Sequence, residues 1–196
     1  MRADRRHIGM RRVVKVALMV LTVPVAVLAW FAPNIHGYYR FQEICEKEGG
    51  LRIYGKLRKG EGWLADKHGR YDPASFEGVP FVRKPDSQGR VVDYKFKGGR
   101  PGDDRSYEAT PADPSIAVAY QIKTVVRQPV PGELRLDRSG YEVSDVSTGQ
   151  LLVRWYQFSY SRFEQNRTVL AAPSGVYCHL SNGFFEPANY QSYFEH

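Results

Sequence analysis

The feature that most constrains this chain is a run of 17 uncharged residues at positions 16–32, most of which are apolar. As an α-helix rising about 1.5 Å per residue, the run would be roughly 25 Å long and would approach the thickness of a bilayer's hydrocarbon core. We therefore predict a transmembrane signal-anchor over residues 16–33, with a kink at Pro24. The residues expected to form the anchor are Val16, Leu18, Leu21, Val25, Leu28 and Trp30.

The positive charge of the chain is concentrated before this run. Residues 1–15 carry a net charge of +5 out of a total of +7, so the whole remainder of the chain carries only +2. Basic segments beside a membrane span stay in the cytoplasm, which predicts a cytoplasmic segment 1–15 and an exported domain 34–196. This arrangement is typical of a bacterial inner membrane protein with a periplasmic domain. Because a nucleic-acid-binding domain would itself be basic, we expect membrane lipid and no nucleic acid among the partners.

A cleaved signal peptide is the alternative to a retained anchor, because a basic segment followed by an apolar run has the same general pattern. Cleavage after Ala29 would place Trp30 at the new N-terminus. Cleavage after Ala32 would place Trp30 at a position that requires a small residue and Pro33 immediately after the cut. Neither position suits the peptidase, so the sequence favours a retained anchor.

The segment after the anchor has the pattern of a short helix followed by a strand. Tyr38, Phe41 and Cys45 recur at helical spacing, and the two glycines at residues 49–50 can end the helix. Residues 51–58 then alternate between apolar and basic or polar side chains, as expected for a strand with one buried face.

Most of the remaining chain predicts β-structure. Strands are expected at residues 92–97, 116–126, 133–146, 151–162 and 168–180, with a turn at 147–150 and an interruption at 173–175. Residues 59–78 and 98–115 are rich in Gly, Pro and charge, and we expect surface loops there. Since the strands connect locally, the predicted fold class is α+β, with a mainly antiparallel sheet and one or two helices.

The chain has only two cysteines, Cys45 and Cys178. If the domain lies outside the cytoplasm, two cysteines and no more favour a single disulfide between them. The alternative is a pair of unpaired buried thiols, since cysteine packs as a small apolar residue. A cytoplasmic domain would favour this alternative.

A cysteine enzyme is a less suitable interpretation of the same residues. The segment at Cys178 distantly resembles the Ser-x-Gly-Cys-x-Arg signature of L,D-transpeptidases, but Tyr177 replaces the glycine and Leu180 the arginine. His179 is adjacent to Cys178, and on a strand it would point to the opposite face and could not act as its base. The histidines lack metal-ligand spacing and no phosphate-binding glycine motif occurs. We therefore predict no catalytic residue, no metal and no cofactor.

Two surfaces are candidates for binding. The first is a basic strand face close to the anchor that could contact anionic lipid headgroups, although such faces are more often simply solvated; it comprises Arg52, Lys56, Arg58 and Lys59. The second is a group of aromatic residues near the end of the chain, which are expected to cover the sheet rather than to form an exposed partner site: Phe184, Phe185, Tyr190, Tyr193 and Phe194. Tyr156, Phe158 and Tyr160 share one strand face and are expected to form the floor beneath them.

These observations favour a membrane-anchored, non-enzymatic binding or accessory module of the bacterial envelope, with another envelope protein as its candidate partner. Two other hypotheses remain open at this level. One is an envelope hydrolase or transferase whose site has no familiar motif, for which a reactive thiol of low pKa would be evidence. The other is an immunity or inhibitor protein that acts at the membrane.

Overall fold

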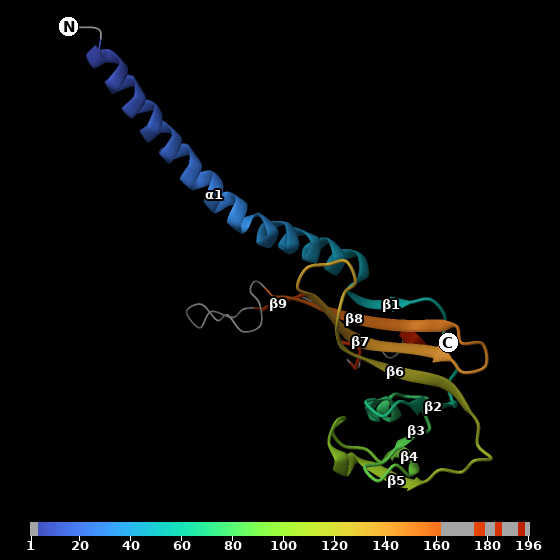
Figure 1. Ribbon diagram of the computed structural model, residues 1–196. Helices are drawn as coiled ribbons and strands as arrows, with labels where there is room; N and C mark the ends of the chain where they lie inside the picture. Colours follow the sequence, from blue (N-terminus) through green and yellow to red (C-terminus); the bar gives the residue numbers. More distant parts are fainter. Residues whose placement is uncertain (1–3, 162–174, 179–182, 186–191, 195–196) are drawn as a thin grey trace.

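The structure is a computed structural model that describes residues 4–161, 175–178, 183–185 and 192–194, with side chains from residue 19 onward. Its first element is one uninterrupted helix, α1 (Asp4–Glu48), which continues from the N-terminal segment through the expected anchor and ends just before Gly49. Pro24 and Pro33 both lie inside it, and each lacks the N–H of a helical hydrogen bond. The helix accordingly bends partway along its length (Figure 1). Over Met19–Glu48 it is long and apolar enough to cross a membrane.

The rest of the described chain forms a nine-stranded sheet. Its strands are β1 (Gly50–Ile53), β2 (Gly62–Ala65), β3 (Val82–Pro85), β4 (Val91–Phe96), β5 (Tyr107–Pro111), β6 (Val118–Pro129), β7 (Leu136–Asp145), β8 (Leu151–Ser161) and β9 (Gly175–Tyr177). They lie in the order β1-β8-β7-β6-β2-β3-β4-β5, and β9 pairs with β8. Only the β2–β3 and β2–β6 pairs are parallel. One long helix followed by a mainly antiparallel sheet confirms the α+β class.

The two segments predicted as surface loops contain regular structure, and these predictions were wrong. Residues 59–78 include β2 and the short 3₁₀ helix η1 (Asp72–Ser75), and residues 98–115 include η2 (Asp104–Ser106) and β5. The strand β3 was not predicted either. Because β2 lies between two parallel neighbours and is buried on both faces, its four residues show no alternation that a sequence pattern could reveal.

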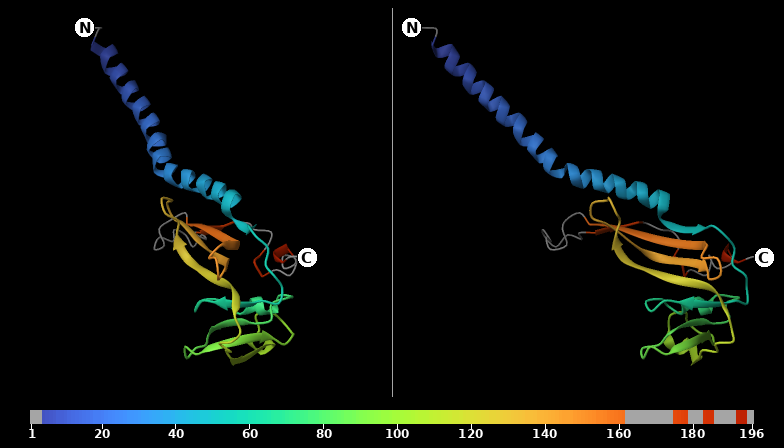
Figure 2. Two further views of the ribbon diagram at one scale, coloured as in Figure 1. Left: turned by 90° about the vertical axis from the view of Figure 1, so that its right-hand side faces the viewer. Right: turned by 45° about the vertical axis from the view of Figure 1, so that its right-hand side comes forward.

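The two faces of the sheet are covered by different elements. The C-terminal part of α1 runs beside β8, and β2–β5 lie at the end of the sheet farthest from it (Figure 2). Phe41 and Ile44 of α1 pack with one β8 face, where they bury Tyr156, Phe158 and Tyr160. This corrects the expected position of the three β8 aromatic residues, which lie beneath the helix.

The aromatic residues near the end of the chain bury the other face of the sheet. Phe184, Tyr193 and Phe194 are buried, and they belong to the cluster that contains Trp63 and Phe76. The hydroxyl of Tyr193 donates to the carbonyl of Phe184 at 2.9 Å, which satisfies its polar atom inside this core. Phe185 is half-buried, and Tyr190 lies outside the described residues.

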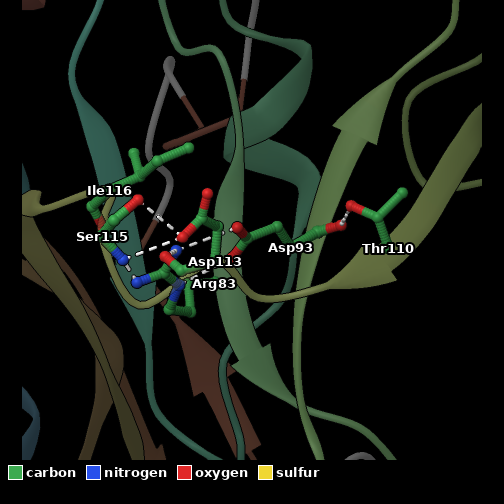
Figure 3. Close-up of polar contacts among 6 residues, drawn as sticks. All are labelled: Arg83, Asp93, Thr110, Asp113, Ser115 and Ile116. Carbon is green, nitrogen blue, oxygen red and sulfur yellow. Dashed lines mark hydrogen bonds and ion pairs between the residues drawn. The ribbon is translucent and has the colours of Figure 1, made fainter.

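An ion pair between β3 and β4 holds the connection that leads from β5 into β6 (Figure 3). Arg83 Nε and Nη2 donate to the two carboxylate oxygens of Asp93 at 2.7 and 2.9 Å, and both side chains are largely buried. The same guanidinium donates to the carbonyl oxygens of Asp113 at 2.7 Å and Ile116 at 3.0 Å. The Ser115 hydroxyl donates to the Asp113 carboxylate at 2.7 Å and lowers the pKa of that carboxyl. The connection is therefore fixed at both its backbone and its side chains.

A second polar cluster surrounds Tyr156 on the face of β8 beneath α1. The guanidinium groups of Arg138 and Arg154 lie over the Tyr156 ring at 4.7 and 5.0 Å from its centre, and the Tyr156 hydroxyl donates to Glu142. Burial, together with the hydrogen bond to Glu142, raises the pKa of Tyr156 to about 12. The folded protein therefore keeps a proton that the unfolded chain releases near pH 10.

Tyr156 is expected to contribute stability that is present below pH 10 and is lost as the pH rises towards 12. Relative to Y156F, the wild type should lose about 1 kcal/mol of unfolding free energy between about pH 9 and 11. Thermal or denaturant unfolding of both proteins across this range measures the difference. Parallel pH profiles for the two proteins would contradict the expectation, because phenylalanine keeps the packing and removes only the ionisable hydroxyl.

Candidate functional site

The two cysteines are joined in a disulfide between the end of α1 and the residue that follows β9, with their Cα atoms 5.7 Å apart. Cys178 is buried, and its backbone N–H donates to the carbonyl of Phe158 at 3.1 Å. This is the pairing that the cysteine count favours. The bonded pair is a structural link between helix and sheet, so neither sulfur is available as a nucleophile while the bond is intact.

The expected anchor residues lie on the part of α1 that has no contact with the sheet (Figure 1). Leu21, Val25, Leu28 and Trp30 are all exposed. Val16 and Leu18 lie in the part of the helix whose side chains are not described. Exposed apolar side chains all around a helix are what a lipid environment accommodates and water does not.

The four residues of the predicted basic face all contact other parts of the chain. Arg52 donates to the carbonyl oxygens of Glu46 and Lys47 at the end of α1, and Lys56 donates to the carbonyl of Ser192 at 2.7 Å. The other two form exposed ion pairs, Arg58 with Glu61 at 3.6 Å and Lys59 with Glu77 at 3.4 Å. Each of the four cations therefore has a partner within the domain, and contact of these residues with lipid stays a prediction.

One concave surface of the domain is a groove of about 640 Å³ on the sheet face opposite α1. Its floor comes from three neighbouring strands, because the sheet register places Thr124 of β6, Tyr141 of β7 and Trp155 of β8 side by side. Phe184 and Phe185 form one wall, and the ring of Tyr141 stacks on that of Phe184 with 5.2 Å between centres. Burial raises the pKa of the Tyr141 hydroxyl above its ordinary value.

The floor of the groove depends on a glycine. At Gly140, a Cβ atom would overlap the carbonyl oxygen of Trp155 on the neighbouring strand. Any side chain would force β7 and β8 apart at the point where Tyr141 and Trp155 are aligned. The close approach of these two strands therefore sets the spacing of the aromatic floor.

Polar groups surround the aromatic floor. His68, Arg127, Ser139 and Gln157 line the groove, and Ser139 and Gln157 are opposite each other in the β7–β8 register. The charge of Arg127 is neutralised by Asp137, with Nε 2.7 Å from the carboxylate. An apolar floor with a mostly neutral polar rim is suited to a ligand that has both apolar and hydrogen-bonding parts.

Asp66 links the groove to β2. One oxygen of its carboxylate accepts the backbone N–H of Thr124 at 2.9 Å, which holds the end of β2 against β6. The other oxygen and the Thr124 hydroxyl are buried and have no hydrogen-bond partner in the described part of the chain. Since Thr124 lines the groove, this pair leaves unused hydrogen-bonding capacity next to the groove floor.

The side chains of His68 and Ser139 are of types that also occur in hydrolase sites. Within the described residues, no hydrogen bond joins His68 to Ser139, although both line the groove. Nor do the residues described bring three or more His, Cys, Asp or Glu side chains together in a group that could hold a metal ion.

The sequence offered no signal for this site. Its floor combines residues of three strands, and its wall comes from Phe184 and Phe185, which are far along the chain from two of these strands. His179, which the sequence placed beside Cys178, lies outside the described residues. Comparisons of the chain with protein-family models, curated proteins and solved structures find no match.

Proposed function

We propose that this chain is a membrane-anchored binding module of the bacterial cell envelope. In this proposal α1 crosses the inner membrane with its basic N-terminus in the cytoplasm, and the sheet domain lies in the periplasm. The aromatic groove binds a segment of another envelope protein. No catalytic step is part of the proposal.

The proposed location rests on one observation: the same helix, α1, contains the apolar run and one cysteine of the disulfide. α1 has exposed apolar residues along its first part and is bonded through Cys45 to the sheet. Disulfides persist in oxidising compartments such as the periplasm, and the basic residues before the apolar run favour a cytoplasmic N-terminus. Both arguments support the same topology.

The composition of the groove supports a protein partner. Tyr, Trp, Phe and Arg are the residue types enriched at protein interfaces, and this groove has an aromatic floor with a polar rim. The strands that form it also give a rigid base, which lowers the entropic cost of binding. A peptide segment could place an apolar side chain on the aromatic floor and use its free backbone groups to bond to the polar rim.

Filling the groove is expected to weaken partner capture. In Q157R, the longer arginine extends from the half-buried Gln157 position into the groove, so recovery of a crosslinked partner should fall about tenfold, equivalent to about 1.4 kcal/mol. The measurement is crosslinking in intact cells, followed by purification of the full-length anchored protein and quantification of the captured protein.

The matched control is Q121R, which makes the same substitution at an exposed position on the opposite face of the same sheet. It should leave capture unchanged, and unfolding measurements on both variants exclude a loss of folding. Equal recovery by Q157R and Q121R, or no captured protein above background from the wild type, would reject the groove as the binding site.

A further inference from the structure

The sheet domain contacts α1 directly after the apolar run of the helix ends. Asn34 follows that run by two residues, and its side-chain oxygen accepts a hydrogen bond from Arg135 at 2.7 Å. The Asn34 carbonyl accepts the Tyr160 hydroxyl at 3.2 Å. One turn later, a Cβ atom on Gly37 would lie 2.8 Å from that hydroxyl oxygen. No linker therefore separates the expected membrane span from the domain.

One flank of α1 remains apolar over this stretch, where it borders Tyr160 of β8. Phe31, Ile35 and Tyr39 recur at intervals of four residues and are 47%, 49% and 66% exposed. From Arg40 onward the exposed residues of α1 are polar or charged, and Lys47 pairs with Glu43. Residues 16–39 would extend about 36 Å as a helix, which reaches beyond a hydrocarbon core of roughly 30 Å into the headgroup layer.

One loop of the domain is held against the same stretch of α1, between Asn34 and Arg40. The β6–β7 connection arches towards α1 (Figure 1), and two of its residues bind the helix. Glu133 pairs with Arg40 at 2.6 Å and Arg135 bonds to Asn34. Leu134 lies between these two contacts and is 53% exposed. An exposed apolar side chain is thus held close to α1 by a polar contact on each side of it in the sequence.

We propose that the domain lies directly on the membrane that α1 crosses, with Ile35, Tyr39 and Leu134 in contact with the lipid headgroup layer. This proposal rests on the proposed function, because it requires α1 to span the membrane. The partner is a phospholipid surface: tyrosine is enriched at this interface and small apolar groups insert there, while Arg40 and Arg135 bring positive charge close to anionic headgroups. The groove, on the opposite face of the sheet from α1, then opens away from the membrane.

The proposal can be tested with the full-length chain reconstituted in vesicles of phosphatidylcholine and phosphatidylglycerol. Because Cys45 and Cys178 are bonded, a single introduced cysteine can carry an environment-sensitive fluorophore. The variants are L134C, V91C on β4 at the far end of the sheet (Figure 1), and V25C in the middle of the apolar run. Since interfacial groups lie within about 5–10 Å of the acyl boundary, nitroxides on lipid headgroups should quench L134C at least about threefold more than V91C.

The three variants test the contact of the domain with the membrane separately from the membrane span of α1. Quenching of V25C by nitroxides deep in the acyl chains, without quenching of L134C above V91C, would overturn the membrane contact and keep the anchor. Absence of quenching at V25C would overturn both. If L134C is shielded from a water-soluble quencher but not quenched by lipid nitroxides, a second copy of the chain covers the loop and the lipid assignment is wrong.

Discussion

Replacing both cysteines in a C45A/C178A variant is expected to lower the free energy of unfolding by about 3–5 kcal/mol. The disulfide closes a loop with a sequence separation of 133 residues, so it removes many conformations from the unfolded chain. The chain-entropy treatment gives about 5 kcal/mol for a closure of this length, and measured losses are often smaller. Denaturant unfolding of the wild type and the variant in the same detergent or lipid provides the measurement.

The wild type unfolded in the presence of a reductant is the control, because it should lose about the same free energy without any substitution. Thiol trapping in intact cells tests the location at the same time. Two protected sulfurs in the cell, released only by reduction, fit a domain in an oxidising compartment. Two free thiols in denatured wild type, or unfolding that does not respond to reductant, would show that no bond forms.

The long elements of this fold could be predicted because their patterns are simple. The end of α1 at Glu48 follows from the glycines at positions 49 and 50, and the hairpin of β7 and β8 follows from alternation on either side of a turn. The short strands β2, β3 and β5 could not be predicted in the same way. They have four or five residues each, and β2 owes its position to Trp63 in the core and to parallel neighbours far along the chain.

The position of the aromatic residues shows why the candidate site escaped prediction. Alternation along β8 correctly places Tyr156, Phe158 and Tyr160 on one face, but it does not say which element covers that face. The helix covers it, since its Phe41 lies 6.0 Å from Tyr160 between ring centres. The C-terminal aromatic residues therefore lie on the other face, where Phe184 meets Tyr141 and forms the groove wall. Which element covers which face of the sheet depends on the whole domain, so the pattern of a single strand cannot predict it.

Removal of the Arg83 side chain is expected to cost about 3–5 kcal/mol of stability in an R83A variant. Asp93 would keep a buried carboxylate that has lost its bidentate partner, and burying an unpaired charge is strongly unfavourable. The carbonyl oxygens of Asp113 and Ile116 would also lose their donor, which releases the connection into β6. Equilibrium unfolding in denaturant measures the loss.

Two further variants test whether the loss of stability in R83A comes from the unpaired buried carboxylate of Asp93 or from the removal of any arginine. R90A removes an arginine from an ion pair with Asp86 on the same β3–β4 hairpin, but the Arg90 side chain is 71% exposed, so the expected loss is below about 1 kcal/mol. R83M/D93L removes both charges and should cost clearly less than R83A, because no unpaired carboxylate remains. If R83A is no more harmful than R90A, the pair is not effectively buried. If the double variant is worse than R83A, the hydrogen bonds to the connection, rather than the charge of Asp93, dominate.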